Sequence, residues 1–289
     1  MRRQLLAGLL AVVLVSTGCA STQGGSSAAS SGTLDRIKAT KTLNLGYRDS
    51  SVPFSFAGPE QKPTGYSVDL CNRVADDLKR DLQIPDLAVK WTMVTVETRM
   101  TAVQNGTIDL ECGSTTNTLS RQALVDFSLT TFVTGASLLA LKDTLTADPT
   151  KLRIAVIPGT TTEKVIKEVL AKAQPPVQFI SVKDHADGRT AIENKTADAY
   201  ASDREILIGL ALTAQNPASF ALADRYFSYE PYALVLRRSD PDFRIAVNRS
   251  LARLFRSGDI IVIYQRWLGA LGAPGAIQLA TWAIEGLPE

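Results

Sequence analysis

Hydrophobic residues follow two alternating patterns along the chain, short apolar runs and stretches with helical spacing. Apolar positions from Val68 to Leu78 repeat every three or four residues, which predicts an amphipathic helix over Tyr66–Lys79 with Cys71 on its buried face. Around it the pattern predicts strands over Leu43–Tyr47, Leu87–Met93 and Ile108–Cys112, a Pro-containing loop over Ser50–Gly58, and a helix over Thr98–Gln104 that ends at Asn105-Gly106. This β-α-β-α-β order is typical of a parallel sheet covered by helices.

The same order begins again after a long apolar strand predicted over Phe132–Leu141. The segments that follow are strands over Arg153–Ile157, Val177–Val182 and Ala197–Ala201, with helices over Thr161–Lys172, Thr190–Asn194 and Glu205–Leu212. Thr160 and Glu163 have the spacing of a capping box at the first of these helices. A second long strand over Tyr229–Arg237 then precedes two closing helices, Asp242–Ser257 and Ile260–Leu268.

Two βα units joined by two long extended segments predict a molecule of two lobes. The fold class is α/β, with a mostly parallel sheet and flanking helices in each lobe and the two long strands as a hinge. We expect residues 34–134 to form the first part of lobe 1, 135–230 to form lobe 2, and 231–289 to form the closing part of lobe 1 and a C-terminal tail. Because α/β proteins bind ligands at lobe interfaces, the cleft between the lobes is the expected site.

The N-terminal segment follows neither pattern. Arg2 and Arg3 precede an uncharged apolar core, Leu5–Val15, and small residues then lead to Cys19, so residues 1–18 read as a secretory signal peptide. Gly18-Cys19 resembles a bacterial lipobox, in which the cysteine is acylated, although Ser16 stands where a leucine is usual. Cleavage nearby without a lipid is the alternative. Residues 19–33 are rich in small and polar residues and predict a flexible tether that would hold an extracytoplasmic protein at the membrane.

Composition and charge narrow the function further. The 289 residues are 45% hydrophobic and 21% charged, which suits two packed domains, and the net charge of +2 with no Lys/Arg cluster argues against nucleic-acid binding. The apolar stretch Ile260–Ile284 contains Arg266 and Pro274, so we expect no second membrane span. Cys71 and Cys112 favour a disulfide in an exported protein; two buried thiols are the alternative.

Motifs of enzymes and metal sites are missing from the sequence. It holds no G-x-S-x-G, H-E-x-x-H, Walker A or G-x-G-x-x-G pattern, one histidine, His185, and no Cys-x-x-Cys pair. A metal site, a cofactor site and a histidine-based triad are therefore not expected.

A polar loop, Gly113–Asn117, lies directly after a predicted strand, with Arg121 just beyond. Hydroxyls and free amides suit a carboxylate, and arginine adds a bidentate clamp; a helix-capping loop beside a solvated arginine is the alternative.

The pattern Ser114-x-Thr116 with Arg121 resembles the α-carboxylate clamp of the amino-acid-binding proteins of bacterial ABC importers, solute-binding protein family 3. The chain is most similar to the glutamate/aspartate-binding branch of that family, in order and spacing from about Leu34 to Leu268. The similar segments are Ser50–Ser55, Gly65–Ser67, Gln104–Thr107, Glu111–Asn117, Gly159–Thr161 and Lys183–His185. The resemblance implies the two-lobed type II fold of periplasmic binding proteins.

The resemblance also implies roles for the groups that would hold the backbone of an amino acid. Arg121, Ser114 and Thr116 would bind its α-carboxylate. Thr160 would add a contact from lobe 2, with its backbone N–H near a helix start. Asp203 would accept the α-ammonium group, its alternative being an ordinary helix N-cap.

A second group would face the ligand's side chain. Arg48 and Arg99 match the pair that faces a side-chain carboxylate, and His185 matches a residue that reaches the ligand's carboxylates. The alternatives are two surface arginines and a loop histidine. Val96 departs from the pattern, because the most similar members have a serine hydroxyl there; its loss puts the preference among glutamate, aspartate and their amides in doubt.

Taken together, these charges predict an acidic amino acid as the ligand. Three arginines and one aspartate complement two carboxylates and one ammonium, whereas a neutral ligand would leave Arg48 and Arg99 uncompensated. We expect a non-enzymatic, monomeric protein that delivers glutamate or aspartate, with asparagine and glutamine as further candidates, to the membrane subunits of an ABC permease. The alternatives are an extracellular amino-acid sensor that reports to a membrane partner and a dehydratase-like enzyme on the same fold.

Overall fold

The computed structural model describes residues 32–145 and 148–288. The predicted signal peptide, Cys19 and most of the tether lie outside these residues and stay predictions. At the end of the predicted tether, Thr33 begins helix α1 (Thr33–Thr40), and its amide and hydroxyl both donate to the Asp240 carboxylate, at 2.9 and 2.5 Å. None of the helices in the described ranges is both long and apolar enough to cross a membrane.

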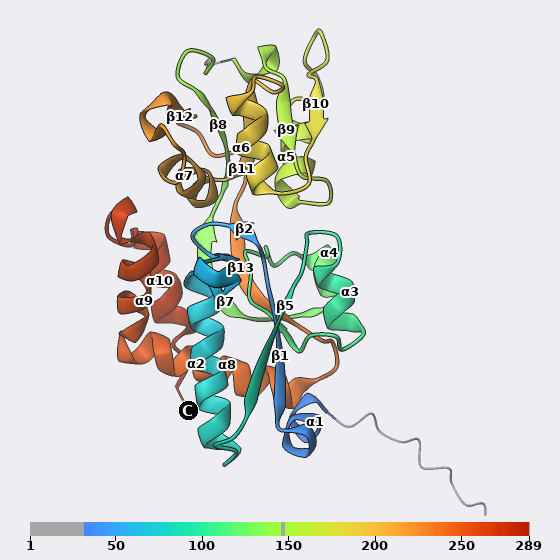
Figure 1. Ribbon diagram of the computed structural model, residues 1–289, viewed down its shortest axis with the longest axis vertical. Helices are drawn as coiled ribbons and strands as arrows, with labels where there is room; N and C mark the ends of the chain where they lie inside the picture. The colour runs from blue at the N-terminus through green and yellow to red at the C-terminus, as the bar shows by residue number, and fades with distance from the viewer. Residues whose placement is uncertain (1–31, 146–147, 289) are drawn as a thin grey trace, which may run out of the picture. The chain divides into compact units, whose positions relative to one another are not determined.

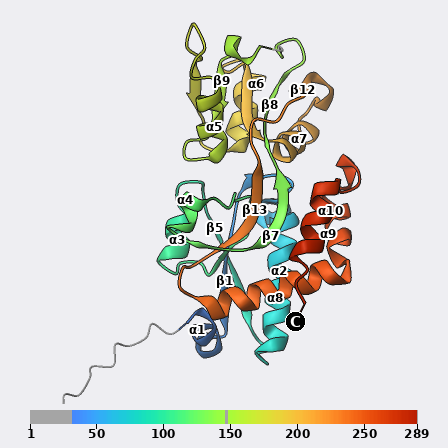
Figure 2. The same ribbon diagram turned by 180° about the vertical axis from the view of Figure 1, so that it is seen from behind.

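Lobe 1 is built on a five-stranded sheet with the order β5-β1-β6-β13-β7. Its strands are β1 (Thr42–Tyr47), β5 (Ala88–Met93), β6 (Leu110–Glu111), β7 (Asp126–Thr134) and β13 (Glu230–Leu236), and β13 is antiparallel to both of its neighbours. The helices are α2 (Tyr66–Asp81), α3 (Arg99–Gln104), α4 (Leu119–Gln122), α8 (Pro241–Ser257), α9 (Asp259–Leu268) and α10 (Ala276–Glu285). Helices α2, α8, α9 and α10 gather on one side of the lobe and α3 lies on the other (Figures 1 and 2).

Lobe 2 repeats this design with the sheet order β10-β9-β11-β8-β12. Strands β9 (Ile154–Val156), β10 (Phe179–Ser181) and β11 (Ala199–Asp203) are parallel, and β8 (Ala136–Leu141) runs antiparallel to β11 and to β12 (Phe220–Leu222). Its helices are α5 (Thr161–Val169), α6 (His185–Glu193) and α7 (Arg204–Leu212). Both lobes therefore have the mostly parallel, helix-flanked sheet of the predicted α/β fold.

Two segments connect the lobes (Figure 1). The sequence predicts one strand over Phe132–Leu141, but the chain divides there into β7 of the first sheet and β8 of the second, with Gly135 between them. The returning segment runs alongside: the Phe227 amide donates to the Ala136 carbonyl at 2.8 Å, and Glu230 of β13 pairs with Thr134. A Cβ on residue 135 would lie 2.3 Å from the Ser228 carbonyl oxygen, so only glycine fits at this junction.

The predicted amphipathic helix is confirmed as α2, which extends two residues beyond Lys79 to Asp81. Its apolar positions are buried against the first sheet, where Leu43 and Leu45 of β1 are fully buried. Cys71, on the buried face as predicted, forms a disulfide with Cys112 at the end of β6. The bond ties the helix to the strand beneath it, so the expected disulfide is confirmed for this pair.

Several elements differ from the predicted ones. The expected loop Ser50–Gly58 contains β2 (Ser50–Ser51) and β3 (Ser55–Ala57), which form a small antiparallel sheet with β4 (Pro63–Thr64). Helix α6 begins five residues before Thr190, because the Asp184 side chain accepts a hydrogen bond from the Asp187 amide and caps it. Strand β12 and helices α1 and α10 were not predicted. Short 3-10 turns complete the described chain at η1 (Pro59–Gln61), η2 (Pro149–Lys151), η3 (Pro217–Ser219) and η4 (Gly269–Leu271).

Candidate functional site

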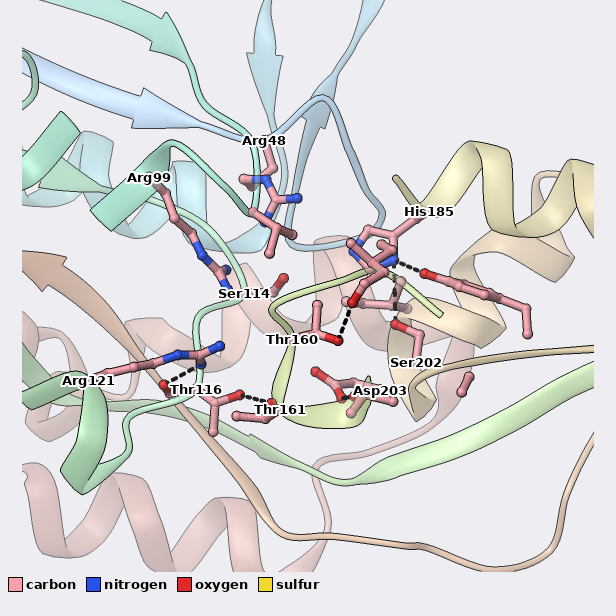
Figure 3. A pocket seen from close by; sticks show the side chains of 16 residues that line it. Arg48, Arg99, Ser114, Thr116, Arg121, Thr160, Thr161, His185, Ser202 and Asp203 are labelled. Atoms are coloured by element: carbon pink, nitrogen blue, oxygen red, sulfur yellow. Dashed lines mark hydrogen bonds between the residues drawn. The ribbon is translucent and has the colours of Figure 1, made fainter. Parts of the chain in front are cut away.

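A cavity lies where the two lobes meet, and all eight site residues predicted from the sequence line it (Figure 3). Lobe 1 contributes its residues from the ends of β1 and β6 and from α3 and α4, and lobe 2 contributes from the starts of α5, α6 and α7. The remaining lining residues are Val96, Ile157, Thr161, Thr162, Tyr200, Ala201, Ser202 and Ile206.

Three arginines of lobe 1 converge on this cavity. Arg48 follows β1 and is 2% exposed, and Arg99 at the start of α3 is 4% exposed, so neither is a surface arginine. Burial, followed by the charge of Arg99, lowers the pKa of Arg48 to about 10, and burial also lowers the pKa of Arg99. The Nε atoms of both residues are buried without a hydrogen-bond partner within the described chain. Two desolvated guanidinium groups in this state favour an anion between them.

Arg121 reaches the cavity from α4 and contacts both lobes. Its Nη1 donates to the Thr116 carbonyl at 2.8 Å, and its Nη2 lies 3.4 Å from the Gly159 carbonyl of lobe 2. Helix α4 begins at Leu119, because the Thr118 hydroxyl accepts a hydrogen bond from the Arg121 amide. Burial lowers the pKa of Arg121 to about 10, so the guanidinium keeps its charge at neutral pH. Ser114 lines the cavity beside it and is 8% exposed.

The start of α5 presents amide groups to the cavity from lobe 2. Thr160 is the N-cap: its hydroxyl accepts from the Glu163 amide at 3.0 Å and donates to the Ile157 carbonyl, so the side chain is used within the cap. The Glu163 carboxylate bonds the Gly159 amide and not that of Thr160, so the predicted capping box is made in one direction. The Thr160 amide is 3.4 Å from the Ile157 carbonyl. The amides of Thr161 and Thr162 are among the first donors of the helix and have no hydrogen-bond partner within the described ranges.

Asp203 ends β11 at the N-cap position of α7, but its side chain does not cap that helix. Its Oδ1 accepts from the Thr162 hydroxyl at 2.8 Å, and its Oδ2 accepts from the Tyr232 hydroxyl. Burial, and then the charge of Glu230, raise the pKa of Asp203 to about 7. The carboxyl therefore faces the cavity as an acceptor whose charge favours a cationic partner.

His185 supplies a neutral side chain to the same cavity. Its Nδ1 lies 2.7 Å from the Tyr200 hydroxyl and 3.4 Å from that of Ser202. Burial, and then the charges of Arg48 and Arg99, lower the pKa of His185 to about 3, so the ring is uncharged at neutral pH. With Nδ1 accepting from Tyr200, Nε2 carries the hydrogen and can donate to a carboxylate.

Two buried carboxylates of the site were missed in the sequence. Glu230, the first residue of β13, is 2% exposed; its Oε2 accepts from the Thr116 hydroxyl at 2.6 Å and from the Thr161 hydroxyl at 2.7 Å. Because Thr116 belongs to lobe 1 and Thr161 to lobe 2, Glu230 links the lobes. Glu111 at the end of β6 is fully buried beneath the arginines. Neither position gives a sequence signal, since a glutamate at the edge of a strand is ordinary.

The cavity therefore combines three guanidinium groups, free amides and hydroxyls on one side with an acidic acceptor on the other. This arrangement can bind a small molecule that carries both carboxylate and ammonium groups. Metal binding finds no support in residues 32–145 and 148–288, where no group of three or more His, Cys, Asp or Glu side chains is arranged to hold an ion.

Two mostly parallel α/β lobes with a charged cavity between them define a two-lobed solute-binding protein, and the sequence comparison agrees. The chain belongs to the bacterial extracellular solute-binding proteins, family 3, whose pattern it matches over residues 43–270. Among its relatives is the L-glutamate/L-aspartate-binding protein of Pseudomonas aeruginosa, 38% identical over 82% of this chain and 80% of the relative. The glutamate/aspartate import solute-binding protein of Escherichia coli is 35% identical over 92% of this chain and 88% of the relative.

Solved structures of similar fold agree with this membership. The ancestral amino acid-binding protein AncCDT-1, a precursor of cyclohexadienyl dehydratase, is 26% identical and superposes with a TM-score of 0.68 over 82% of this chain and 99% of its own. An ABC uptake transporter substrate binding protein from Streptococcus pneumoniae, solved with bound histidine, has a TM-score of 0.74 over 83% of this chain and 97% of its own. At 18% identity it supports the fold alone.

Proposed function

We propose that the protein binds glutamate or aspartate between its two lobes outside the cytoplasmic membrane and delivers it to an ABC permease. The observation that carries this proposal is the convergence of Arg48, Arg99 and Arg121 in one buried cavity opposite Asp203. The relatives in Pseudomonas aeruginosa and Escherichia coli, which are named for glutamate and aspartate, support the same ligand class. Delivery to a permease is supported by the name of the Escherichia coli relative, an import solute-binding protein.

In the proposed complex, Arg121 and Ser114 hold the α-carboxylate from lobe 1. The amides of Thr161 and Thr162 at the start of α5 hold it from lobe 2, because the hydroxyl and amide of Thr160 already bond Ile157. The hydroxyl hydrogen of Thr116 is engaged by Glu230. Its oxygen therefore serves as an acceptor and, with Asp203, receives the α-ammonium group.

The side-chain carboxylate lies between Arg48 and Arg99 in this proposal. An anion there can accept hydrogen bonds from the two guanidinium groups, whose Nε atoms have no partner among the described residues. Neutral His185 adds a donor through Nε2. Val96 lines the cavity without a hydroxyl, so the ligand's side chain lacks one hydrogen-bond donor that the family pattern would supply. Asparagine and glutamine therefore stay candidates as weaker ligands.

Isothermal titration calorimetry of the purified chain against each standard amino acid tests the ligand class. We expect glutamate or aspartate to bind most tightly, because an uncharged side chain would leave buried positive charge at Arg48 and Arg99 uncompensated. The tightest binding of an aliphatic or a basic amino acid would contradict the assignment of Arg48 and Arg99 and with it the proposed function.

Two arginine substitutions test the division of roles within the cavity. Arg121→Ala should weaken the binding of every amino acid by about a hundredfold or more, because it removes the partner of a group that all of them share. Arg99→Ala should mainly reduce the preference for glutamate over glutamine, by about tenfold. Calorimetry with both ligands measures these effects. Arg266→Ala serves as the control, since its exposed side chain pairs with Asp69 on α2. Equal losses for both ligands in both cavity variants would refute the assignment.

We infer that the bound ligand is released unchanged. The acid–base groups of the cavity support binding, since His185, with its pKa lowered to about 3, is a weak base and both oxygens of Asp203 are held by Thr162 and Tyr232. Mass spectrometry of glutamate or aspartate recovered after incubation with the protein should give the starting compound alone. A dehydrated or rearranged product would instead favour the dehydratase-like alternative.

A further inference from the structure

Glu111 is a fully buried acidic residue that does not line the cavity. It ends the short strand β6, where it pairs with Gly46 of β1 on one side and with Val235 of β13 on the other. This position is the middle of the lobe 1 sheet, immediately behind the arginines at its carboxyl edge. A charge is costly there unless neighbouring groups compensate it.

The contacts of Glu111 lead directly to Arg99. Its Oε2 accepts from the Thr115 hydroxyl at 2.8 Å, and the oxygen of that hydroxyl accepts from Arg99 Nη1 at 2.7 Å. The other oxygen, Oε1, is buried and has no hydrogen-bond partner among the described residues. Thr115 thus connects the carboxylate to one of the two arginines assigned to the ligand's side chain.

Arg48 lies on the other side of the same carboxylate. A Cβ on residue 113 would lie 2.1 Å from Glu111 Oε1 and 3.1 Å from Cγ of Arg48, so Gly113 leaves room for both side chains. Burial lowers the pKa of both arginines, and the charge of Glu111 opposes this change in each. Glu111 is therefore an internal counter-charge for the Arg48–Arg99 pair.

These contacts determine the net charge at the end of the cavity that Arg48 and Arg99 line. The Asp49 carboxylate also acts on Arg48, but Asp49 is partly exposed and its charge is screened by solvent. Among the fully buried groups, two guanidinium groups and the Glu111 carboxylate leave one positive charge without a partner, and a buried charge is costly unless it is compensated. An amide would supply too little negative charge, and a doubly charged anion would supply too much.

We propose that Glu111 limits the side-chain end of the cavity to a ligand with one negative charge, and that it thereby determines specificity. This inference rests on the proposed function. Glu111 selects a ligand whose side chain ends in a carboxylate over one that ends in a dianionic group such as a phosphonate. Glu111 does this without contacting the ligand itself. Replacement of Glu111 by a neutral residue converts the subsite to one that prefers a dianion.

Two glutamate analogues isolate charge from shape. L-2-amino-4-phosphonobutyrate and L-2-amino-4-sulfobutyrate both end in a tetrahedral group, but at alkaline pH the phosphonate carries two negative charges and the sulfonate one. Calorimetry of the wild-type chain should give tighter binding of the sulfonate. In Glu111→Gln the ratio of the two affinities should shift toward the phosphonate by about tenfold or more, because one nearby negative charge is removed.

Thr115→Val is the matched control. It breaks the chain of hydrogen bonds from Arg99 to Glu111 but keeps the carboxylate, so the affinity ratio should stay near that of the wild type. A shift of equal size in both variants would assign the effect to the position of Arg99 and overturn the proposal. An unchanged ratio in Glu111→Gln would also overturn it.

A second measurement needs no variant and covers the case in which Glu111→Gln does not fold. If the subsite accepts one charge, the wild-type chain binds the phosphonate as its monoanion and takes up about one proton at alkaline pH. Calorimetry in two buffers of different ionisation enthalpy counts that proton, with the sulfonate as the reference that takes up none. Binding of the phosphonate without proton uptake would contradict the inference. Failure to bind glutamate and aspartate at all would instead reject the proposed function.

Discussion

Asp203 is a single carboxyl group on which burial, a neighbouring charge and two hydrogen bonds act in opposite directions. Burial and the charge of Glu230 raise its pKa, and the hydrogen bonds from Tyr232 and Thr162 lower it, with a balance at about 7. An α-ammonium group bound beside it would lower the pKa again, because it stabilises the charged form. The protonation of this one residue is therefore coupled to ligand binding.

The coupling predicts a pH dependence of ligand affinity. Since the carboxyl has a lower pKa in the complex than in the free protein, binding is strongest above about pH 7 and weakens as the pH falls below it, by up to about tenfold per unit. His185 stays neutral in this range, because its pKa is lowered to about 3. Calorimetry with glutamate at several pH values between about 5 and 8 measures the effect.

Asp203→Asn is the control for this prediction. The amide cannot lose a proton, so the variant should bind more weakly at pH 8 and should lack the decline below pH 7. A wild-type affinity that stays constant over the same range would show that Asp203 does not accept the ammonium group.

At the scale of secondary structure, the junction of β7 and β8 is where one continuous apolar run serves two different sheets. Gly135 separates the strands, and a Cβ there would approach the Ser228 carbonyl to 2.3 Å and the Tyr226 ring to 2.7 Å. Gly135→Ala should lower the free energy of unfolding by about 1–3 kcal/mol, because the nearest obstacle is backbone that cannot rotate away. Urea denaturation followed by circular dichroism measures the loss.

Gly269→Ala provides a matched comparison. There the nearest atom to an added Cβ is Oε1 of the flexible Gln265 side chain, at 2.8 Å, and the backbone has helical angles that suit alanine. We expect stability within about 0.5 kcal/mol of the wild type. If both variants lose the same stability, close packing at the junction is not the cause.

At the scale of the whole molecule, Glu230 joins the lobes by accepting hydrogen bonds from Thr116 of lobe 1 and Thr161 of lobe 2. Glu230→Ala should favour the open arrangement and weaken ligand binding by about ten- to a hundredfold. The variant removes the acceptor of the two hydrogen bonds that join the lobes when they are closed. Small-angle X-ray scattering with and without glutamate reports the opening, and stopped-flow fluorescence reports faster dissociation.

Ser228→Ala tests whether the link between the lobes is responsible. Ser228 donates to the other oxygen of Glu230, at 2.6 Å, without joining it to Thr116 or Thr161. This variant should keep the scattering profile and dissociation rate of the wild type. The prediction for Glu230 fails if both variants open equally, or if Glu230→Ala closes as fully as the wild type.

Periodic elements could be predicted from the sequence because their signal is local. Helix α2 repeats its apolar residues every three or four positions, and the predicted and observed helices share the start at Tyr66. The small β2-β3-β4 sheet and β12 gave no comparable signal, since two or three residues are too few for a period. Helix α10 was taken as part of the C-terminal tail, because Pro274 interrupts the apolar pattern before it. The disulfide of Cys71 and Cys112 could be predicted because few pairings were available.

By itself, then, the sequence determined the two-lobed α/β plan. Its resemblance to the family implied eight candidate site residues, and the structure places these around one cavity. Only the tertiary structure decided which charges meet there. Glu230 lies 114 positions from Thr116 and 69 from Thr161, yet it bonds both hydroxyls, and Glu111 becomes the counter-charge of Arg48 and Arg99 through the packing around Gly113. Local periodicity fixes which face of an element is buried, whereas the pairing of buried charges depends on how distant elements pack.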